Sequence, residues 1–368
     1  MKRNLCSVLL CSSLLAAATG LILFPQDVSG AVSYGMRLCA DTLLPNLFPF
    51  MVLSGVFVRS GLAERLGEKA DSLMRNLFQL PGVCFSAWLF GMIGGYPTGA
   101  KTVVSLYRSG SCSKDEAEHT LAFCNNCGPG FLISGIGFGM FQNTMCGIVL
   151  YAIHIVAAFL TGVTLAPSSR ITHHKTGSNP GRTASFPVCF VTSVSDAMSA
   201  FLNLCAFVLC FSAILVLVER SGVAALLASV LPFAKENATG FLLGCIEMTC
   251  GIFHLTESNF TECFIIITAL AAWGGLSVHC QTISLLQDTD LSPVLYLKGK
   301  LIHALIAILL AMCVSFGIPL SYSAVVGTIL AGLLRRSKKA VEMRAKVYYN
   351  GGRKNKGVVK HEPVPEKN

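Results

Sequence analysis

The chain has 368 residues, of which 53% are hydrophobic and 13% charged, and its mean hydropathy is +0.64. The charged share is about half of the roughly 25% that is usual in soluble domains. These values exclude a water-soluble globular enzyme and a disordered or fibrous chain, because only a bilayer accommodates so much apolar sequence. We therefore expect an all-α polytopic membrane protein.

The net charge of +9 is unevenly distributed along the chain. Eleven of the 28 Lys and Arg residues lie between Arg335 and Lys367, and most others separate apolar stretches. This distribution is typical of the charge bias that orients a membrane protein, and no nucleic-acid partner is expected. The 16 cysteines lie mostly within apolar stretches, which indicates small packing residues of a reduced protein.

Apolar stretches in chain order predict eight membrane crossings. The first, after Lys2 and Arg3, is about as long as a bilayer crossing and is longer than the apolar part of a signal peptide. The crossings are expected over 5–24, 43–58, 116–141, 145–165, 190–218, 264–286, 301–316 and 318–334. Two further apolar segments, 82–108 and 239–257, are interrupted by Gly-rich or polar residues and are predicted to be re-entrant hairpins.

The two halves of the chain follow the same plan. The stretch GVFVRSGLAERL (55–66) resembles LVLVERSGVAALL (215–227), and a broken segment, a second broken segment and a clean span follow each. The predicted organisation is an N-terminal transmembrane helix over 1–25, a first repeat over 36–165 with its hairpin at 82–108, a cytoplasmic loop over 166–188, a second repeat over 189–317 with its hairpin at 239–257, a last transmembrane helix over 318–334 and a basic cytoplasmic tail over 335–368.

The positive-inside bias favours two hairpins that do not cross. With this topology, 25 of the 28 basic residues, Lys298 and Lys300 among them, and both termini are cytoplasmic. Each repeat then has an odd number of crossings, so the repeats have opposite orientations and the hairpin tips meet near the midplane. This is the inverted-repeat plan of a secondary transporter.

The first hairpin tip has the sequence GGYPTG at 94–99. Its glycines and proline interrupt the helix and leave backbone N–H groups without helical partners. Such N–H groups at a helix N-terminus bind anions and polar groups. The alternative is a plain kink or loop. The candidate solute-binding residues here are Gly95, Tyr96, Thr98, Gly99 and Lys101.

The stretch CNNCGPG at 124–130 places Asn125, Asn126 and Gly128 at a second break. Adjacent Asn side chains in a membrane segment either join helices by hydrogen bonds or contact a solute. A redox or zinc function for the Cys-x-x-Cys spacing is disfavoured because no second ligand pair of matching spacing follows.

The second half offers Glu247 and Thr249 at the second hairpin tip, and Ser277 and Gln281 after Gly274-Gly275. An acidic residue inside an apolar span indicates function by default. Glu247 could carry a proton or cation, bind a hydroxyl-rich solute or pair with Lys101. His279 and Gln281 could instead face a solvated mouth.

His154 and His303 lie in otherwise clean spans, where a hydrogen-bonded structural role and a proton relay both remain open. No catalytic residue, metal site or cofactor is predicted.

The segments 24–66, GMIGGYPTGAK (91–101), FCNNCGPGFLISGIGFGMF (123–141) and AAWGGLSVHCQT (271–282) resemble the sporulation integral membrane protein YlbJ family, which carries the nucleoside recognition, or Gate, domain. More distantly, they are similar to the hairpin and broken-helix core of concentrative nucleoside transporters. The resemblance implies a multi-pass plasma-membrane protein of endospore-forming bacteria that is needed for sporulation.

From these features we expect a transporter or channel-like protein, not an enzyme, that moves a small polar, nucleoside-like solute or an ion between the two hairpin tips. The alternative is a non-transporting membrane scaffold for spore-envelope assembly. Membrane lipid and the solute or ion are the expected partners, and association of identical chains is left open.

Overall fold

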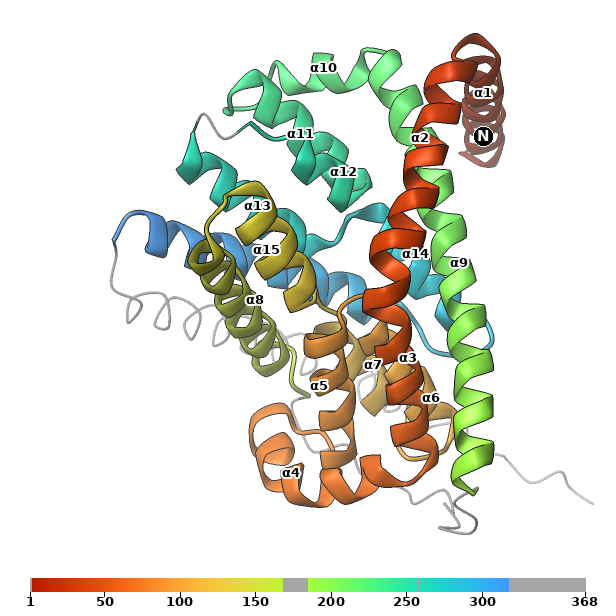
Figure 1. The fold of residues 1–368 in the computed structure, drawn as a ribbon, viewed down its shortest axis with the longest axis vertical. Coiled ribbons are helices and arrows are strands. Elements are labelled where there is room, and N and C mark those ends of the chain that lie inside the picture. Colours follow the sequence, from red (N-terminus) through yellow and green to blue (C-terminus); the bar gives the residue numbers. More distant parts are fainter. Residues whose placement is uncertain (1, 168–184, 257–258, 318–368) are drawn as a thin grey trace, which may run out of the picture.

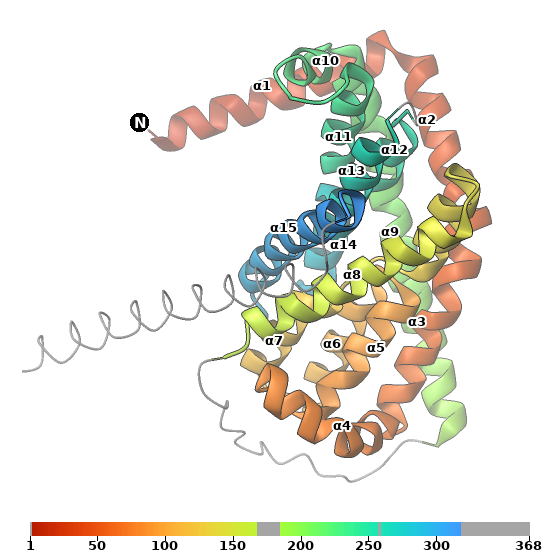
Figure 2. The ribbon, with the colours of Figure 1, turned by 90° about the vertical axis from the view of Figure 1, so that its left-hand side faces the viewer.

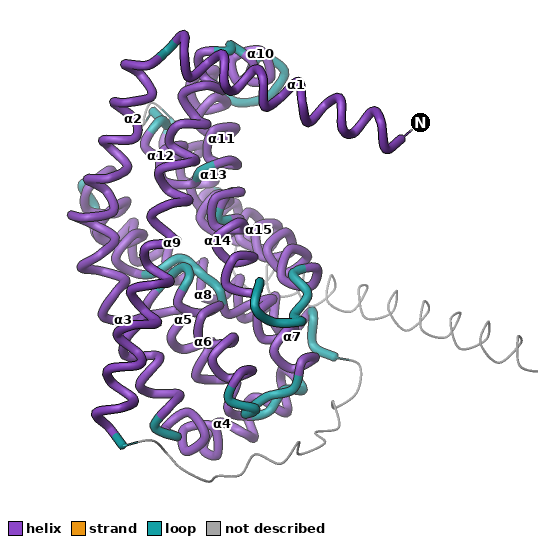
Figure 3. The backbone as a smooth tube through the Cα atoms, turned by 90° about the vertical axis from the view of Figure 1, so that its right-hand side faces the viewer, coloured by secondary structure: helices purple, strands orange, loops and turns teal. Residues whose placement is uncertain are grey.

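The computed structural model describes residues 2–167, 185–256 and 259–317 (Figure 1). Within these ranges every regular element is a helix (Figure 3), which confirms the all-α prediction. The elements are α1 (Lys2–Leu23), α2 (Pro25–Arg37), the π-helix η1 (Leu38–Leu43), α3 (Leu44–Arg59), α4 (Leu62–Phe78), the short 3₁₀ turn η2 (Gly82–Cys84), α5 (Phe85–Gly94), α6 (Thr98–Arg108), α7 (Lys114–Cys124), the π-helix η3 (Gly130–Met140), α8 (Thr144–Thr164), α9 (Phe186–Arg220), α10 (Val223–Ala228), α11 (Lys235–Ile246), α12 (Met248–Phe253), α13 (Phe260–Trp273), α14 (Gly275–Leu286) and α15 (Val294–Ser315).

Four to six of the described helical segments are long and apolar enough to cross a membrane. Four qualify without a partner segment: 144–164, 186–220, 260–286, which comprises α13 and α14, and 294–315. Two more qualify only as bent pairs, 14–23 with 25–41 and 47–59 with 62–78. The chain is thus a multi-pass membrane protein. The predicted last span (318–334), the basic tail (335–368) and most of the predicted loop at 166–188 lie outside the described residues.

A long antiparallel pair of helices forms one side of the molecule (Figure 1). Helices α2, η1 and α3 continue one another from Pro25 to Arg59, and they pack against α9, which has the same length of 35 residues. At about 1.5 Å per residue, each is longer than the roughly 30 Å hydrocarbon core of a bilayer. Ion pairs join the two at opposite ends, Arg59 with Asp196 and Arg220 with Asp27.

Helix α1, predicted as the first membrane helix, does not continue this line. Pro25 begins α2, and Phe24 before it has left the helical region, as the residue preceding a proline tends to do. The two helices meet at 97°, and α1 projects away from the other helices (Figure 2).

The similar segments 55–66 and 215–227 form matching turns. Helix α3 ends at Arg59-Ser60-Gly61 and α9 ends at Arg220-Ser221-Gly222, and both glycines have positive φ, +74° and +72°. The amphipathic helix α4 follows the first turn and the short apolar helix α10 follows the second, and each is succeeded by a helical hairpin. The hairpin α5–α6 lies with α4 at one end of the molecule, and α11–α12 lies with α10 at the other (Figures 1 and 2).

Each hairpin is followed by a broken helix and then a continuous one. Helix α7 ends before the extended residue Asn125, and η3 begins at Gly130. Helices α13 and α14 are separated at Gly274 and Gly275, whose φ angles are +92° and +77°. Helices α8 and α15 are unbroken and pack against each other. The helix breaks therefore occur where the sequence predicts them.

The second hairpin depends on direct backbone contact between its two helices. A Cβ atom built on Gly251 of α12 would lie 2.1 Å from the Cα of Gly244 on α11.

We expect Gly251→Ala to lower the thermal unfolding temperature of the purified protein by several degrees, because overpacking typically costs about 1–3 kcal/mol. Gly30→Ala in α2, where a Cβ would meet nothing within 4 Å, is the control and should leave the temperature unchanged or slightly raised. Equal behaviour of the two variants would contradict this packing.

Candidate solute-binding site

The tip of the first hairpin is the turn Gly95–Pro97, which contains a cis Tyr96–Pro97 peptide bond. Gly95 has φ +73°, and a Cβ there would lie 2.9 Å from the backbone nitrogen of Gly128. Cβ atoms on Gly91 and Gly99 would lie only 1.7 and 2.2 Å from the carbonyl oxygen of Cys124. The predicted tip therefore encloses the C-terminal end of α7, and the glycines are what allow this contact.

Asn125 joins three helices by hydrogen bonds. Its Oδ1 accepts from the backbone N–H of Ala100 in α6 (3.4 Å), and its Nδ2 donates to Oγ1 of Thr282 in α14 (2.9 Å). Its carbonyl oxygen accepts from Nζ of Lys300 in α15 (3.1 Å). Of the two roles open to Asn125, these contacts favour joining helices.

Two other polar atoms near this tip are buried without a hydrogen-bond partner among the described residues. They are Oγ1 of Thr98 and Oδ1 of Asn126. Asn126 donates from Nδ2 to the carbonyl oxygen of Phe123 (2.7 Å), so only half of its amide is satisfied. Buried polar atoms are normally paired, and an unpaired one in a native fold is a position for water or a ligand.

At the second tip, Glu247 is the extended residue between α11 and α12. Its two carboxylate oxygens accept from the backbone N–H groups of Thr249 (3.2 Å) and Cys250 (2.8 Å). An acidic side chain at this position caps the first turn of α12 and complements its dipole. The predicted alternative pairing of Glu247 with Lys101 does not occur, because the two line different cavities.

A cavity of about 610 Å³ lies between the two tips and is lined mainly by apolar and aromatic side chains of α2, η1, α3, η3 and α9. Both broken helices and both hairpins reach it. Six of the twelve predicted solute-binding residues line it: Gly95, Tyr96, Gly128, Glu247, Thr249 and Gln281.

The other six predicted residues lie outside this cavity. Gly99 packs on α7, and Thr98, Asn125 and Asn126 are buried behind the tip. Ser277 accepts a hydrogen bond from Nε2 of Gln281 (3.1 Å) and so orients a cavity side chain. Lys101 lines a second cavity. Gln281 and His279 are buried, so the alternative of a solvated mouth does not hold for them.

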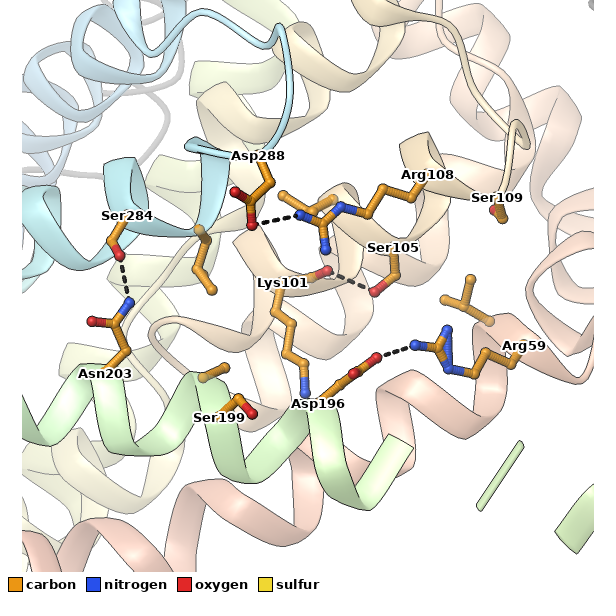
Figure 4. A pocket seen from close by; sticks show the side chains of 14 residues that line it. Arg59, Lys101, Ser105, Arg108, Ser109, Asp196, Ser199, Asn203, Ser284 and Asp288 are labelled. Carbon is orange, nitrogen blue, oxygen red and sulfur yellow. Dashed lines mark hydrogen bonds and ion pairs between the residues drawn. The ribbon is translucent and has the colours of Figure 1, made fainter. Parts of the chain in front are cut away.

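The second cavity, of about 380 Å³, is lined by charged and polar side chains (Figure 4). Three contacts across it join segments that are distant in sequence: Arg59 to Asp196, Arg108 to Asp288 (3.5 Å) and Asn203 to Ser284. Lys101 is only 7% exposed, and its Nζ donates to the carbonyl oxygen of Met51 (3.4 Å).

The two cavities follow one another along the same elements. On α9, Leu204 and Val208 line the larger cavity and Asn203 the smaller. On α14, Gln281 lines the larger and Ser284, about one turn later, the smaller. Helix α3 and the first hairpin also contribute to both, so the smaller cavity lies between the larger one and the end of the molecule where α6 terminates.

Sequence reasoning missed one cluster behind the first tip. Lys300, which the predicted topology places on the cytoplasmic side, is 1% exposed and contacts Tyr96, Asn125 and His303. The apolar pattern predicts that this span starts at 301, whereas α15 begins at Val294 and so includes Lys300. The spacing of Tyr296, Lys300 and His303 at i, i+4 and i+7, which places them on one helix face, was the available signal.

His154 and His303 both form hydrogen bonds with backbone groups. Nε2 of His154 accepts from the backbone N–H of Cys127 (2.9 Å), and Nε2 of His303 lies 3.2 Å from the carbonyl oxygen of His154. The two imidazole rings are 4.6 Å apart. Of the two roles left open by the sequence, these contacts favour the hydrogen-bonded structural one.

Comparison with known proteins supports the family resemblance. Residues 40–168 match the family model described as nucleoside recognition, or Gate. The chain is also 24% identical to the sporulation integral membrane protein YlbJ of Bacillus subtilis (strain 168) over 341 residues, which cover 83% of this chain and 82% of that protein. No solved structure matches the chain significantly. The Gate match includes the first hairpin and the break after α7.

The bonds of Asn125 give a test of its role. We expect Asn125→Ala to lower the unfolding temperature by several degrees, since it leaves a buried N–H and the Thr282 hydroxyl with fewer partners, at about 1–3 kcal/mol for each unsatisfied group. Asn76→Ala at an exposed position of α4 is the matched control. A loss no larger than that of the control would show that Asn125 does not hold these helices together.

Proposed function

We propose that this Gate-domain membrane protein of the YlbJ family acts in endospore formation by moving a small polar, nucleoside-like solute or an ion across the plasma membrane. The observation that carries the proposal is the cavity of about 610 Å³ that both hairpin tips and both helix breaks line. Non-helical backbone at membrane depth is tolerated where it is buried in protein or lines a cavity, which makes these breaks a natural place for a solute.

The lining of the cavity suits a planar ring with a polar end. Its size lies within the roughly 300–1,000 Å³ of small-molecule sites, and such sites combine apolar walls with a few fixed polar groups. Aromatic side chains, among them Tyr34, Phe50 and Phe131, supply flat apolar surface. Glu247, Thr249 and Gln281 supply acceptors and donors for hydroxyl or amide groups.

The proposed path uses the two halves as inverted repeats. Both halves have the same order of elements, their long helices α2–α3 and α9 are antiparallel, and their hairpins lie at opposite ends of the molecule (Figure 1). Alternating access then needs one hairpin to yield while the other stays closed. The ion pairs of the smaller cavity are partly exposed, and such pairs contribute only about 0–1 kcal/mol, so they can separate on the way to the cytoplasm.

A non-transporting scaffold for spore-envelope assembly is the second candidate, and the helix-joining bonds of Asn125 favour it. A scaffold needs the tips and breaks for shape alone. Removing a polar group that faces the cavity, without loss of membrane abundance, separates the two roles.

We predict that purified full-length protein is stabilised by a nucleoside or another small polar metabolite, and that Gln281→Ala reduces this thermal shift at least several-fold. Gln281 faces the cavity, whereas Gln287, just after the same helix, is exposed, so Gln287→Ala is the control. A panel of nucleosides, small metabolites and cations is measured by thermal unfolding in detergent. Spore formation by the Gln281→Ala strain at normal membrane abundance gives the cellular readout.

Two results would count against transport. One is the absence of any stabilising compound for the unaltered protein. The other is normal spore formation in strains that carry Gln281→Ala or Glu247→Gln at normal abundance, which would instead support the scaffold.

The topology has its own test. We predict that a reporter inserted at residue 175 and reporters at both termini behave as cytoplasmic: a fluorescent fusion is active and an alkaline phosphatase fusion is inactive. The basic residues Arg170, Lys175 and Arg182 are the reason, because positive loops stay inside. An active phosphatase at residue 175 would rule out two re-entrant hairpins of opposite orientation.

A further inference from the structure

Lys300 is the most deeply buried charged side chain next to the first hairpin tip, and the proposed solute path does not use it. It lies on α15, is 1% exposed and lines neither of the two cavities described above. Within residues 2–167, 185–256 and 259–317, no carboxylate lies within 4 Å of its Nζ. A buried cation without an acidic partner is costly in a bilayer and indicates a specific role.

The Lys300 Nζ instead has three neutral neighbours. It lies 2.7 Å from Oη of Tyr96, 3.1 Å from the carbonyl oxygen of Asn125 and 3.4 Å from Nδ1 of His303.

The surrounding hydrogen bonds require all three neighbours to be acceptors. Oη of Tyr96 donates its own proton to the carbonyl oxygen of Ala271 (2.8 Å), so it accepts from Lys300. Nε2 of His303 faces the carbonyl oxygen of His154, so its proton is there and Nδ1 is an acceptor. A carbonyl oxygen can only accept. Three acceptors match the three N–H groups of an ammonium ion.

One of these acceptors, the carbonyl oxygen of Asn125, lies at the end of a broken helix, and Tyr96 links the group to the end of the other by donating to Ala271. Asn125 is the residue that ends α7, and Ala271 lies in the last turn of α13. The C-terminal end of a helix carries partial negative charge. In transporters with broken helices, such ends and unwound carbonyls are where Na⁺ or H⁺ is coordinated.

We infer that the ammonium group of Lys300 is a tethered cation: it occupies a monovalent-cation site formed by the end of α7, Tyr96 of the first hairpin tip and His303, so that no dissociable metal cation binds there. This inference rests on the proposed function, because it identifies Lys300 as the cation of the proposed transport core. The ammonium ties Tyr96 of the tip directly to α7 and, through the Tyr96 hydroxyl, to α13.

The test removes the tether and offers a free cation. Lys300→Ala should unfold several degrees below the unaltered protein in choline chloride, and sodium chloride at the same ionic strength should restore part of that loss in a saturable way. Lys298→Ala, which removes an exposed lysine two residues earlier on α15, should change neither the temperature nor its independence of sodium. The unaltered protein should unfold at the same temperature in both salts.

Two further variants keep the outcome decisive. Tyr96→Phe retains the tethered ammonium and removes one acceptor, so its loss of stability should not respond to sodium. If Lys300→Ala does not accumulate, Lys300→Gln replaces it, because glutamine fills similar space without charge. Lys298→Gln is then the control, and Lys300→Gln should be less stable than this control.

Three results would overturn the assignment: a saturable sodium-dependent stabilisation of the unaltered protein, a Lys300→Ala variant that is destabilised but indifferent to sodium, or Lys300 variants as stable as the matching Lys298 variants. None of these measurements uses a solute. The inference about Lys300 can therefore fail while the solute-binding test succeeds, and the solute-binding test can fail while the inference about Lys300 holds.

Discussion

The structure depends on satisfying backbone polar groups where helices break inside an apolar protein. An unpaired N–H or C=O in such surroundings costs several kcal/mol, and lipid cannot compensate for it. Each break in this chain has its own partners. Glu247 accepts the free N–H groups at the start of α12, and His154 accepts that of Cys127 after α7. Lys300 donates to the carbonyl oxygen of Asn125, and Tyr96 donates to that of Ala271.

These partners also determine how closely the elements approach. Glycines at the first tip and in the second hairpin allow backbone to lie against backbone, at distances where a Cβ would overlap. A hairpin held by such contacts is precisely placed, yet a small displacement removes much of the contact. Close packing and a few polar bonds, rather than many exposed ion pairs, thus position the tips around the larger cavity.

The polar residues near the tips divide into two groups with different consequences. Asn125, His154, His303 and Lys300 are enclosed behind the first tip and bond to backbone and to one another. Glu247, Thr249 and Gln281 face the cavity and keep some bonding capacity toward it. In the proposed transport cycle, the first group preserves the shape of the site and the second contacts the solute.

The sequence by itself determined the membrane class, the helix breaks and the two hairpin tips, because composition, apolar length and Gly or Pro interruptions are local properties. Half of its twelve candidate residues also line the larger cavity. Only the tertiary structure decided that Lys101 belongs to a separate cavity, that Asn125 joins helices and that Lys300 is buried. Each of these depends on a partner far along the chain, as Lys300 does on Tyr96 and Asn125, and no local pattern specifies which distant group a side chain will meet once the helices pack.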